Sequence, residues 1–276
     1  MIDLHLHSTA SDGTFTPSGI AALGRNCRVL ALTDHDTLAG VEEFMAAGGC
    51  GAKRIAGVEL SIAAEPGYGT FHLLGLGVKR GCAALESLLE RAVKGREERT
   101  PRILERLAAL GVEMDAAEVA AEAGGAFVAR PHVARALVRK GYAADVKDAF
   151  EKYLGSGKPA YVPRWRPRPE DAFAAIHAAG GAAVMAHPRL WTPDPAMLRK
   201  GLAALKEKGL DGIEAVYSAN TIDETRLHLA VAREFGFAVS AGSDFHGENK
   251  PGVKFGMSLP DEEGFLRPLL KLIGED

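Results

Sequence analysis

Residues 2–8 read I-D-L-H-L-H-S, a strand-like stretch from which the rest of the sequence can be interpreted. In a β-strand, side chains two residues apart point to the same side. His5 and His7 therefore face one way, while Leu4 and Leu6 face the other. Two adjacent neutral imidazoles are poorly suited to an apolar core. The pattern thus indicates a strand whose histidine face has a task other than packing.

Short apolar runs of this kind recur along the chain and alternate with helical patterns. The predicted strands cover residues 2–7, 28–33, 54–60, 70–78, 182–186, 211–216 and 237–242. The predicted helices among them cover residues 17–26, 39–48, 169–179, 194–208 and 221–235. Such alternation favours a parallel α/β sheet or barrel. Seven strands are one fewer than the eight of a standard closed (β/α) barrel.

The alternation stops between residues 83 and 168, where the pattern is almost entirely helical. Predicted helices cover 83–110, 115–123, 131–141 and 144–154, and a Pro/Gly-rich exit follows them, G-S-G-K-P-A-Y-V-P-R-W-R-P-R-P. We therefore expect residues 83–168 to form a helical insertion between the fourth and fifth strands. Residues 1–82 and 169–276 would then form one barrel domain.

The insertion differs in charge from the rest of the chain. Residues 91–168 hold sixteen Lys or Arg against ten Asp or Glu, whereas the whole chain has a net charge of −3. A positive insertion over a more acidic barrel suggests an anionic substrate held between them. A solvated helical surface is the alternative. The charge suits a short ligand better than duplex DNA, which would need a broader basic face.

Composition limits the remaining classes. The 276 residues, 47% of them hydrophobic, suit a large globular domain, and no run of eighteen apolar residues predicts a membrane span. No signal peptide is expected. Cys27, Cys50 and Cys82 are too few and too scattered for a disulfide framework or a thiolate zinc site. The sequence therefore favours a cytoplasmic protein, and nothing in it indicates an obligate protein partner.

Six of the nine histidines lie at the ends of predicted strands, together with several carboxylates. His5 and His7 lie on the first strand, and His35 follows the second in T-D-H-D-T. The others are Glu59 in G-V-E-L-S, His72 in T-F-H-L-L-G, His187 in A-H-P, and Asp244 and His246 in S-D-F-H. In a parallel barrel, the carboxyl ends of all strands surround one mouth, where active sites lie. We therefore expect these side chains to converge there.

Converging imidazoles and carboxylates, without thiolates, are suitable ligands for Mn, Fe or Zn. They are too many for one ion, so two or three divalent ions that share a bridging carboxylate are expected, with Glu59 as the bridge. Such clusters serve the hydrolysis of phosphate esters. Each motif alone has a plainer explanation: D-x-H-x-H could lie on an exposed edge strand, and A-H-P could be a capped turn. The ordered set favours the metal site.

The motifs D-L-H-L-H-S, T-D-H-D-T, G-V-E, A-H-P and S-D-F-H, in this order, resemble those of the PHP (polymerase and histidinol phosphatase) family of metal-dependent phosphoesterases. The resemblance covers essentially the whole chain. It implies a distorted seven-stranded TIM-like (β/α)7 barrel of the amidohydrolase type. The insertion, with R-P-H-V-A-R-A-L-V and K-Y-L-G-S-G-K-P-A-Y-V, resembles the branch that contains nucleoside 3′,5′-bisphosphate phosphatases and 5′→3′ exoribonucleases.

The resemblance also implies ligands for three ions, with Mn as the first expectation. The first ion would be held by His5, His7, Glu59 and Asp244, the second by Glu59, His72 and His187, and the third by Asp12, His35 and His246. Asp3 and Asp34 would orient ligating histidines, although Asp3 could also be a polar residue at the start of a strand. A metal-bound hydroxide held by Glu59 and Asp244 would attack phosphorus. No side chain is assigned as the general acid.

Four residues are candidates for substrate binding. The resemblance makes Arg130 the leading phosphate anchor, because Pro131 starts a predicted helix whose N-terminus favours an anion. His132 lies in the same stretch. Arg99 is the second candidate, with a solvated helix face as the alternative. Where relatives commonly read A-H-P-G-R, this chain reads A-H-P-R-L-W. Arg189 therefore either reaches a phosphate from one position earlier, or that contact is lost.

The favoured function is hydrolysis of a phosphate ester of a nucleotide. The substrate would be a nucleoside 3′,5′-bisphosphate, a 5′-phosphorylated short single-stranded RNA, or both. One alternative is a histidinol-phosphate phosphatase, which would need no second phosphate site. The other is a non-catalytic PHP module that binds metal for structure or interaction.

Overall fold

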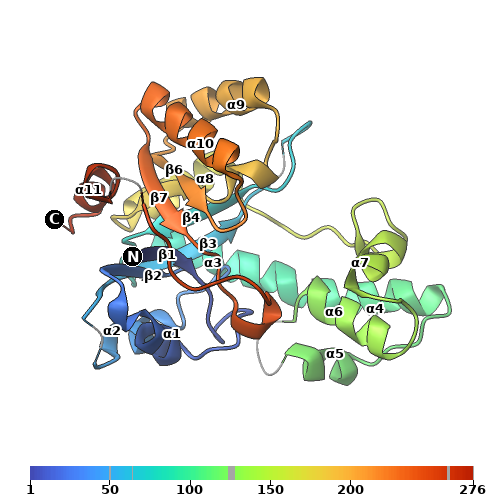
Figure 1. Ribbon diagram of the computed structural model, residues 1–276. Coiled ribbons are helices and arrows are strands. Elements are labelled where there is room, and N and C mark those ends of the chain that lie inside the picture. Colours follow the sequence, from blue (N-terminus) through green and yellow to red (C-terminus); the bar gives the residue numbers. More distant parts are fainter. Residues whose placement is uncertain (50, 64, 124–127, 260–261, 276) are drawn as a thin grey trace. The chain divides into compact units, whose positions relative to one another are not determined.

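The computed structural model in Figure 1 describes residues 1–49, 51–63, 65–123, 128–259 and 262–275. The chain divides into two compact units. One comprises Met1–Leu89 with Pro167–Asp276, and the other comprises Glu90–Arg166. Within the described ranges, no helix combines the length and the apolar character that crossing a membrane requires.

A mixed sheet of seven strands forms the centre of the first unit, with the strands adjacent in chain order. The strands are β1 (Ile2–Leu6), β2 (Val29–Leu32), β3 (Lys53–Ser61), β4 (His72–Leu76), β5 (Ala182–Met185), β6 (Gly212–Tyr217) and β7 (Ala238–Gly242). Each matches a strand predicted from the sequence to within two residues at either end. The prediction of a seven-stranded α/β barrel is confirmed.

The direction of β4 corrects the expectation that all strands run in parallel. β4 pairs antiparallel with both β3 and β5, whereas the other adjacent pairs are parallel. The reason lies in the connection. Only residues 62–71 separate β3 from β4, which is too short for the helical crossover that parallel neighbours need. The amino end of β4 therefore lies beside the carboxyl ends of the other strands.

The two edges of the sheet meet just beyond their regular strands. The Asp244 N–H donates to the His5 carbonyl at 2.9 Å, and the His7 N–H donates to the Phe245 carbonyl at 3.0 Å. Leu6 and Phe245 form an isolated parallel bridge. These bonds bring β1 beside the end of β7, so the sheet is nearly closed into a barrel.

Helices pack against the outside of this barrel. α2 contacts β3, α8 contacts β5, α10 contacts β6 and α11 contacts β7. The helices are α1 (Pro17–Leu23), α2 (Val41–Ala46), α8 (Pro169–Ala178), α9 (Pro195–Glu207), α10 (Ile222–Phe235) and α11 (Glu262–Leu272), with 3₁₀ turns at Gly24–Asn26, Pro188–Leu190 and Gly247–Asn249. The start predicted at Pro17 is confirmed, because the Thr16 hydroxyl accepts the Gly19 N–H. α11 had no counterpart in the sequence prediction.

β1 shows how alternating side chains separate packing from chemistry. Leu6 belongs to an apolar cluster with Ile20 of α1 and Phe44 of α2. His5 and His7 are equally buried but point into the barrel. Both faces of the strand are therefore inside the molecule, and the histidine face lines its interior. Elsewhere, Cys27 is buried and Cys82 is half-buried, while Cys50 lies outside the described residues.

The second unit is helical and has its own apolar core, which includes Ile103, Leu107, Val119, Val133 and Leu137. Its elements are the later part of α3 (Ala83–Glu97), α4 (Arg99–Ala109), α5 (Ala116–Ala123), α6 (Arg130–Arg139), α7 (Val146–Ala149) and a π-helical turn, Phe150–Leu154. This unit, Glu90–Arg166, lies within the stretch 83–168 for which the sequence predicts a helical insertion.

The predicted helix 83–110 is two helices, with a break at Glu98. Pro101 explains the break. Its ring clashes with the carbonyl four residues earlier, and it lacks the N–H that would continue the helix from Glu97. In the first turn of α4 the missing N–H costs nothing, because the first N–H groups of a helix have no partner inside it.

Candidate metal centre

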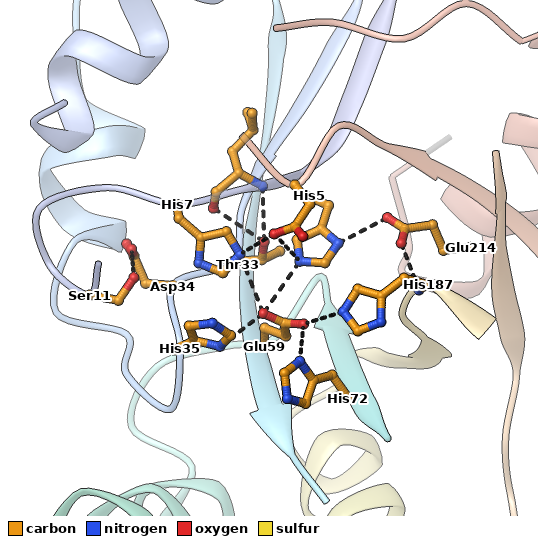
Figure 2. A network of polar contacts seen from close by, with 12 residues as sticks. His5, His7, Ser11, Thr33, Asp34, His35, Glu59, His72, His187 and Glu214 are labelled. Atoms are coloured by element: carbon orange, nitrogen blue, oxygen red, sulfur yellow. Dashed lines mark hydrogen bonds and ion pairs between the residues drawn. The ribbon is translucent and has the colours of Figure 1, made fainter. Parts of the chain in front are cut away.

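Nine potential ligands converge at one end of the barrel. Figure 2 shows how His5, His7, His35, His72 and His187 surround Glu59. We call the nine ligands the His/Asp/Glu cluster: His5, His7, Asp12, His35, Glu59, His72, His187, Asp244 and His246. They come from β1, β3, β4 and the segments that follow β1, β2, β5 and β7. His72 is the first residue of its strand, and it reaches the cluster because β4 is antiparallel. The structure therefore brings together every metal ligand expected from the sequence.

Glu59 lies at the centre and its two carboxylate oxygens face different histidines. Oε1 is 2.9 Å from His72 Nδ1 and 3.1 Å from His187 Nε2. Oε2 is 2.9 Å from His35 Nδ1 and within 3.4 Å of an Nε2 atom of both His5 and His7. The side chain is fully buried. This arrangement suits a carboxylate that bridges two ions.

Asp12 organises the solvent-facing side of the cluster. Its Oδ1 is 3.2 Å from His246 Nε2 and 3.8 Å from His7 Nδ1, and its Oδ2 is 3.9 Å from His35 Nε2. Asp12, His35 and His72 are half-buried, whereas the other six ligands are buried. Access to the cluster is therefore on the side of these three residues.

The donor atoms form overlapping groups, each with ligand atoms within 4.8 Å of one another. The groups are His7 with Asp12, His35 and His246; His5 with His7 and Asp244; His5 with Glu59 and His187; and His35 with Glu59 and His72. His5, His7, His35 and Glu59 each belong to two groups, which is the pattern of neighbouring ions that share ligands.

Unsatisfied polar atoms support the fit of the cluster to cations. Both ring nitrogens of His7, the His5 Nε2, the His187 Nδ1 and the Glu59 Oε2 are buried without a hydrogen bond of good geometry among the described residues. Buried polar atoms without partners are costly. A set of imidazoles and carboxylates left in this state is suited to borderline and hard divalent ions.

The charges within the cluster keep its carboxylates ionised. Burial by itself would raise the pKa of Glu59, but the imidazoles of His35 and His5 hold it well below its ordinary value. The pKa of Asp12 and that of Asp244 are likewise low, because neighbouring imidazoles outweigh burial. Burial lowers the pKa of His72 to about 4. An ionised carboxylate and a neutral imidazole are the forms that bind metal. Against the effect of burial, the carboxylates of Glu214 and Glu59 hold the pKa of His5 well above its ordinary value, so an ion bound by His5 would displace a proton.

Backbone strain gathers at the same place. Among the described residues, the non-glycine positions with positive φ are Asp36 (54°), His187 (30°) and Asp244 (59°). All three follow the ends of strands at the mouth of the barrel. The left-handed conformation is unfavourable for these residues, and such strain is typically found at functional sites.

Asp34 and Asp3 support the cluster through the backbone. Asp34 accepts hydrogen bonds from the Ser8 N–H and hydroxyl at 2.7 Å and from the Ser11 hydroxyl at 2.5 Å. It thereby anchors the segment between His7 and Asp12. Asp3 accepts the N–H groups of Ser243 and Gly256 at 2.9 Å. Asp3 also accepts the N–H of His5 at 3.4 Å. The described contacts of both carboxylates are thus with hydroxyl and backbone N–H groups and include no imidazole ring.

Three supporting residues had not been identified from the sequence. Glu214, fully buried on β6, contacts the His5 ring and the His187 backbone. Tyr217 donates its hydroxyl to Asp244 Oδ2 at 3.1 Å, and Lys250 donates to the same oxygen at 2.5 Å. A glutamate inside the apolar run G-I-E-A-V-Y was the signal that could have revealed Glu214.

The candidate phosphate residues Arg99 and Arg130 lie in the second unit. Arg99 is buried, donates to the Val162 carbonyl at 2.7 Å and lies 5.6 Å from the ring centre of Tyr161. It is therefore not on a solvated helix face. Arg130 donates to the Leu154 carbonyl at 3.1 Å and lies 5.7 Å from the same ring. In the described part of the chain, neither guanidinium has a carboxylate partner.

The unbalanced charge around these guanidinium groups favours an anion. Burial, together with the charges of Arg130 and Arg164, lowers the pKa of Arg99 to about 9. Burial also lowers the pKa of Arg130, and the charge of Arg166 adds to this. Partly buried cations that repel one another are stabilised by an anionic ligand.

His132 and Arg189 have structural partners. The His132 side chain is buried, and its Nδ1 accepts the Ala129 N–H at 2.9 Å at the start of α6. Arg189 lies 3.3 Å from Glu224 Oε1 and donates to the Ala219 carbonyl. Its described contacts are thus with the segment between β6 and α10 and with α10, and they include no residue of the His/Asp/Glu cluster.

Comparison with known proteins reveals relatives across most of the chain, although no protein-family model matches it. It is 38% identical over 248 residues to a 5′-3′ exoribonuclease of Haemophilus influenzae, covering 88% of this chain and 89% of the relative. It is 35% identical over 266 residues to a 3′,5′-nucleoside bisphosphate phosphatase of Chromobacterium violaceum, covering 92% and 90%. It is 34% identical over 264 residues to the 5′-3′ exoribonuclease Rnm of Escherichia coli, covering 93% and 88%.

Two solved structures resemble the whole chain. One, described as a metal-dependent phosphoesterase of Bifidobacterium adolescentis, has a TM-score of 0.82 and 29% identity, covering 98% of this chain and 96% of the other. The second, described as an amidohydrolase of Chromobacterium violaceum with bound sulfate and no metal, has a TM-score of 0.83 and 32% identity, covering 97% and 96%. The fold and the order of the elements are therefore shared over nearly the full length.

Proposed function

This chain belongs to the PHP-like metal-dependent phosphoesterases, and we propose that its substrate is a small nucleotide with two phosphate groups or a short 5′-phosphorylated RNA. The observation that supports this most strongly is the combination of two features. The barrel carries the His/Asp/Glu cluster, and the helical unit carries the buried Arg99 and the half-buried Arg130, neither with a carboxylate partner among the described residues. Relatives named for exoribonuclease and bisphosphate phosphatase activity agree with it.

The cluster would hold two or three divalent ions. In our assignment, Glu59 bridges the first two, with His5, His7 and Asp244 on one side and His72 and His187 on the other. Asp12, His35 and His246 hold the third. Mn is the first expectation, and Fe or Zn would suit the same donors. Bound there, such ions would activate a water molecule and neutralise charge on the phosphoryl oxygens.

Tyr217 and Lys250 orient the carboxylate of Asp244 within the cluster. Tyr217 and Lys250 both bind Asp244 Oδ2, so Oδ1 is the oxygen that faces His5 and His7, at 3.6 and 3.4 Å. Burial raises the pKa of the Tyr217 hydroxyl, which therefore keeps its proton and remains a donor. The Lys250 ammonium is partly exposed at the same edge, where it can also attract a phosphoryl oxygen.

Arg99 and Arg130 would bind the phosphate that is not hydrolysed. Guanidinium groups form bidentate, charge-assisted hydrogen bonds to phosphate. The Tyr161 ring already positions both groups. An enzyme that binds one phosphate at the His/Asp/Glu cluster and another at Arg99 and Arg130 would distinguish a bisphosphate or the 5′ end of an RNA from a simple monoester. A compact pair of cations suits a short strand and not a duplex.

The proposal is tested by phosphate or nucleotide release in the presence of Mn. The substrates are adenosine 3′,5′-bisphosphate, a 5′-phosphorylated short RNA, and histidinol phosphate. The matched controls are a nucleoside monophosphate and the same RNA with a 5′-hydroxyl group. We expect turnover of at least one doubly recognised substrate and much weaker turnover of its control.

The outcomes separate the alternatives. Turnover of histidinol phosphate alone would assign the other activity of the family. Stoichiometric metal binding without turnover of any substrate would favour the non-catalytic module. Equal turnover of the RNA with and without its 5′-phosphate would contradict a second phosphate site.

A further inference from the structure

Glu214 has no role in the ligand assignment above, yet it contacts two members of the cluster, His5 and His187 (Figure 2). Its Oε1 is 2.9 Å from His5 Nδ1, and its Oε2 accepts the His187 N–H at 2.7 Å. The side chain lies on β6 and is fully inaccessible to solvent. It therefore links the histidines of β1 and of the turn after β5.

The contact with His5 selects which ring nitrogen faces the cluster. An N–H on Nδ1 can donate to the carboxylate, which leaves the lone pair on Nε2. Nε2 lies 3.4 Å from Glu59 Oε2 and 3.6 Å from Asp244 Oδ1, and it is buried without a hydrogen bond to any described residue. An imidazole held in this way by a carboxylate is oriented and made more basic toward a metal ion.

The contact with His187 holds a strained backbone. His187 has a φ of 30° and precedes Pro188, which begins a 3₁₀ turn. Glu214 accepts the N–H of this strained residue, and the ring is then directed at Glu59 Oε1, 3.1 Å from Nε2. Without that acceptor the N–H would be buried and unpaired, which is unfavourable.

The adjacent strand leaves room for this arrangement. A Cβ at Gly242 of β7 would overlap both the Glu214 carboxylate and the His5 Cβ. Glycine at this position therefore lets both His5 and the Glu214 carboxylate lie close to β7. Three neighbouring elements, β1, β6 and β7, meet around one carboxylate.

We propose that Glu214 is a positioning residue that fixes the ring orientation of His5 and the backbone of His187, so that ion binding on both sides of Glu59 depends on it. This inference rests on the proposed metal binding. It does not require Glu214 to touch metal or substrate.

The test is metal affinity in the variant Glu214→Gln, measured for Zn²⁺ and Mn²⁺ by competition with a chromophoric chelator. The amide keeps the size of the side chain but has a single acceptor oxygen, so it cannot accept both the His187 N–H and an N–H on His5 Nδ1. We expect affinity to fall about 10–100-fold. Affinity within twofold of the wild type would overturn the proposal.

Asp211→Asn is the matched control. Asp211 is the residue just before β6, at the end of the strand away from the cluster. Like Glu214, it contacts one imidazole and one backbone N–H: its Oδ2 lies 2.7 Å from His177 Nε2 and accepts the Ala183 N–H at 2.7 Å. His177 is outside the cluster. We expect this variant to change stability but not metal affinity. An equal loss of affinity in both variants would mean that Glu214 acts only through general stability.

A measurement on the wild type keeps the proposal testable if the variant does not fold. In the Zn²⁺-loaded protein, ¹⁵N NMR of the histidine rings should show the His5 proton on Nδ1 and no proton on Nε2. A proton on Nε2 would overturn the inference. If the wild type binds neither ion, the proposed function fails instead, so the two failures can be distinguished.

Discussion

At the scale of single residues, the buried carboxylates are of two kinds: some face the imidazoles of the cluster as candidate ligands, and others hold neighbouring residues in place. Glu59 and Asp244 are buried carboxylates that the surrounding imidazoles keep ionised. Asp34 and Glu214 are buried carboxylates that bind N–H and O–H groups nearby. The same chemical group therefore serves either as a candidate ligand or as a support, and its neighbours decide which.

Arg130→Ala tests the phosphate role at this scale. Loss of charge-assisted hydrogen bonds worth about 1.5–3 kcal/mol should raise KM for adenosine 3′,5′-bisphosphate roughly tenfold to a hundredfold. Metal content, measured by plasma mass spectrometry, should not change. Arg102→Ala, which removes an exposed arginine from α4, is the control and should have little effect on KM. A change in the metal content of Arg130→Ala would contradict the assignment of Arg130 to phosphate binding.

The buried His228 should make the folded state less stable at acidic pH. It is buried in α10, and Asn220 Nδ2 lies 3.3 Å from its Nδ1. Burial lowers its pKa to about 4, although Glu224 opposes the shift. In the unfolded chain it titrates near its ordinary value, about 6.5. Below that pH the unfolded state binds a proton that the folded state does not, so stability falls until the pH reaches about 4.

Urea unfolding of wild type and His228→Gln at pH 7 and pH 5 measures this contribution. We expect the wild type to lose about 2 kcal/mol more than the variant over this interval, because one pKa unit corresponds to about 1.4 kcal/mol. Equal losses in the two proteins would show that His228 does not cause the effect.

At the scale of elements, short connections and close packing determine what reaches the site. The brief link between β3 and β4 reverses β4 and thereby delivers His72 to the correct end of the barrel. α9 illustrates close packing. Its Gly201 lies against the ring of Trp191, which is fully buried and stacks on Tyr68 with ring centres 4.1 Å apart. This contact supports the turn that follows His187.

Substitution of two helical glycines tests the packing of α9. By helix propensity alone, each Gly→Ala change would stabilise the protein by up to about 1 kcal/mol. We expect Gly95→Ala in α3 to follow this rule, because the nearest atoms, in Trp165, would be 3.5 Å from the new Cβ. Gly201→Ala should instead destabilise by about 1–3 kcal/mol, because its Cβ would overlap the Trp191 ring. Denaturant unfolding of both variants measures the difference, and equal effects would contradict the packing argument.

At the scale of the whole molecule, metal binding and stability should be coupled. The cluster joins segments from both ends of the barrel sequence, from His5 to His246, and contains buried atoms without hydrogen bonds. Ions that bind only the folded state would connect these segments and satisfy those atoms.

Thermal unfolding after treatment with EDTA, with and without added Mn²⁺, tests this coupling. A ligand at a hundred times its Kd stabilises by about 2.7 kcal/mol per site. For a chain of this size, that should raise Tm by about 5 °C or more. Glu59→Gln, which retains the shape of the proposed bridge without its charge, should lose most of the increase. The same increase in wild type and variant would contradict a bridging role for Glu59.

The local sequence was sufficient for the strands, most helices and the identity of the converging residues. Alternation in I-D-L-H-L-H-S separates a packing face from a functional face whatever surrounds the strand. Histidines and carboxylates beside strand ends could be located for the same reason, since a strand ends at one edge of the sheet. The family resemblance supplied Asp12, whose S-D-G stretch reads locally as a turn.

Only the tertiary structure decided the direction of β4, the closure between β1 and the end of β7, and the contacts of Glu214, Tyr217 and Lys250. It also placed Arg99 in the interior of the helical unit and engaged Arg189 with Glu224. The reason is physical. Periodicity reports which side of an element is buried, whereas a hydrogen bond between Glu214 and His5, 209 positions apart, depends on which elements become neighbours when the sheet closes.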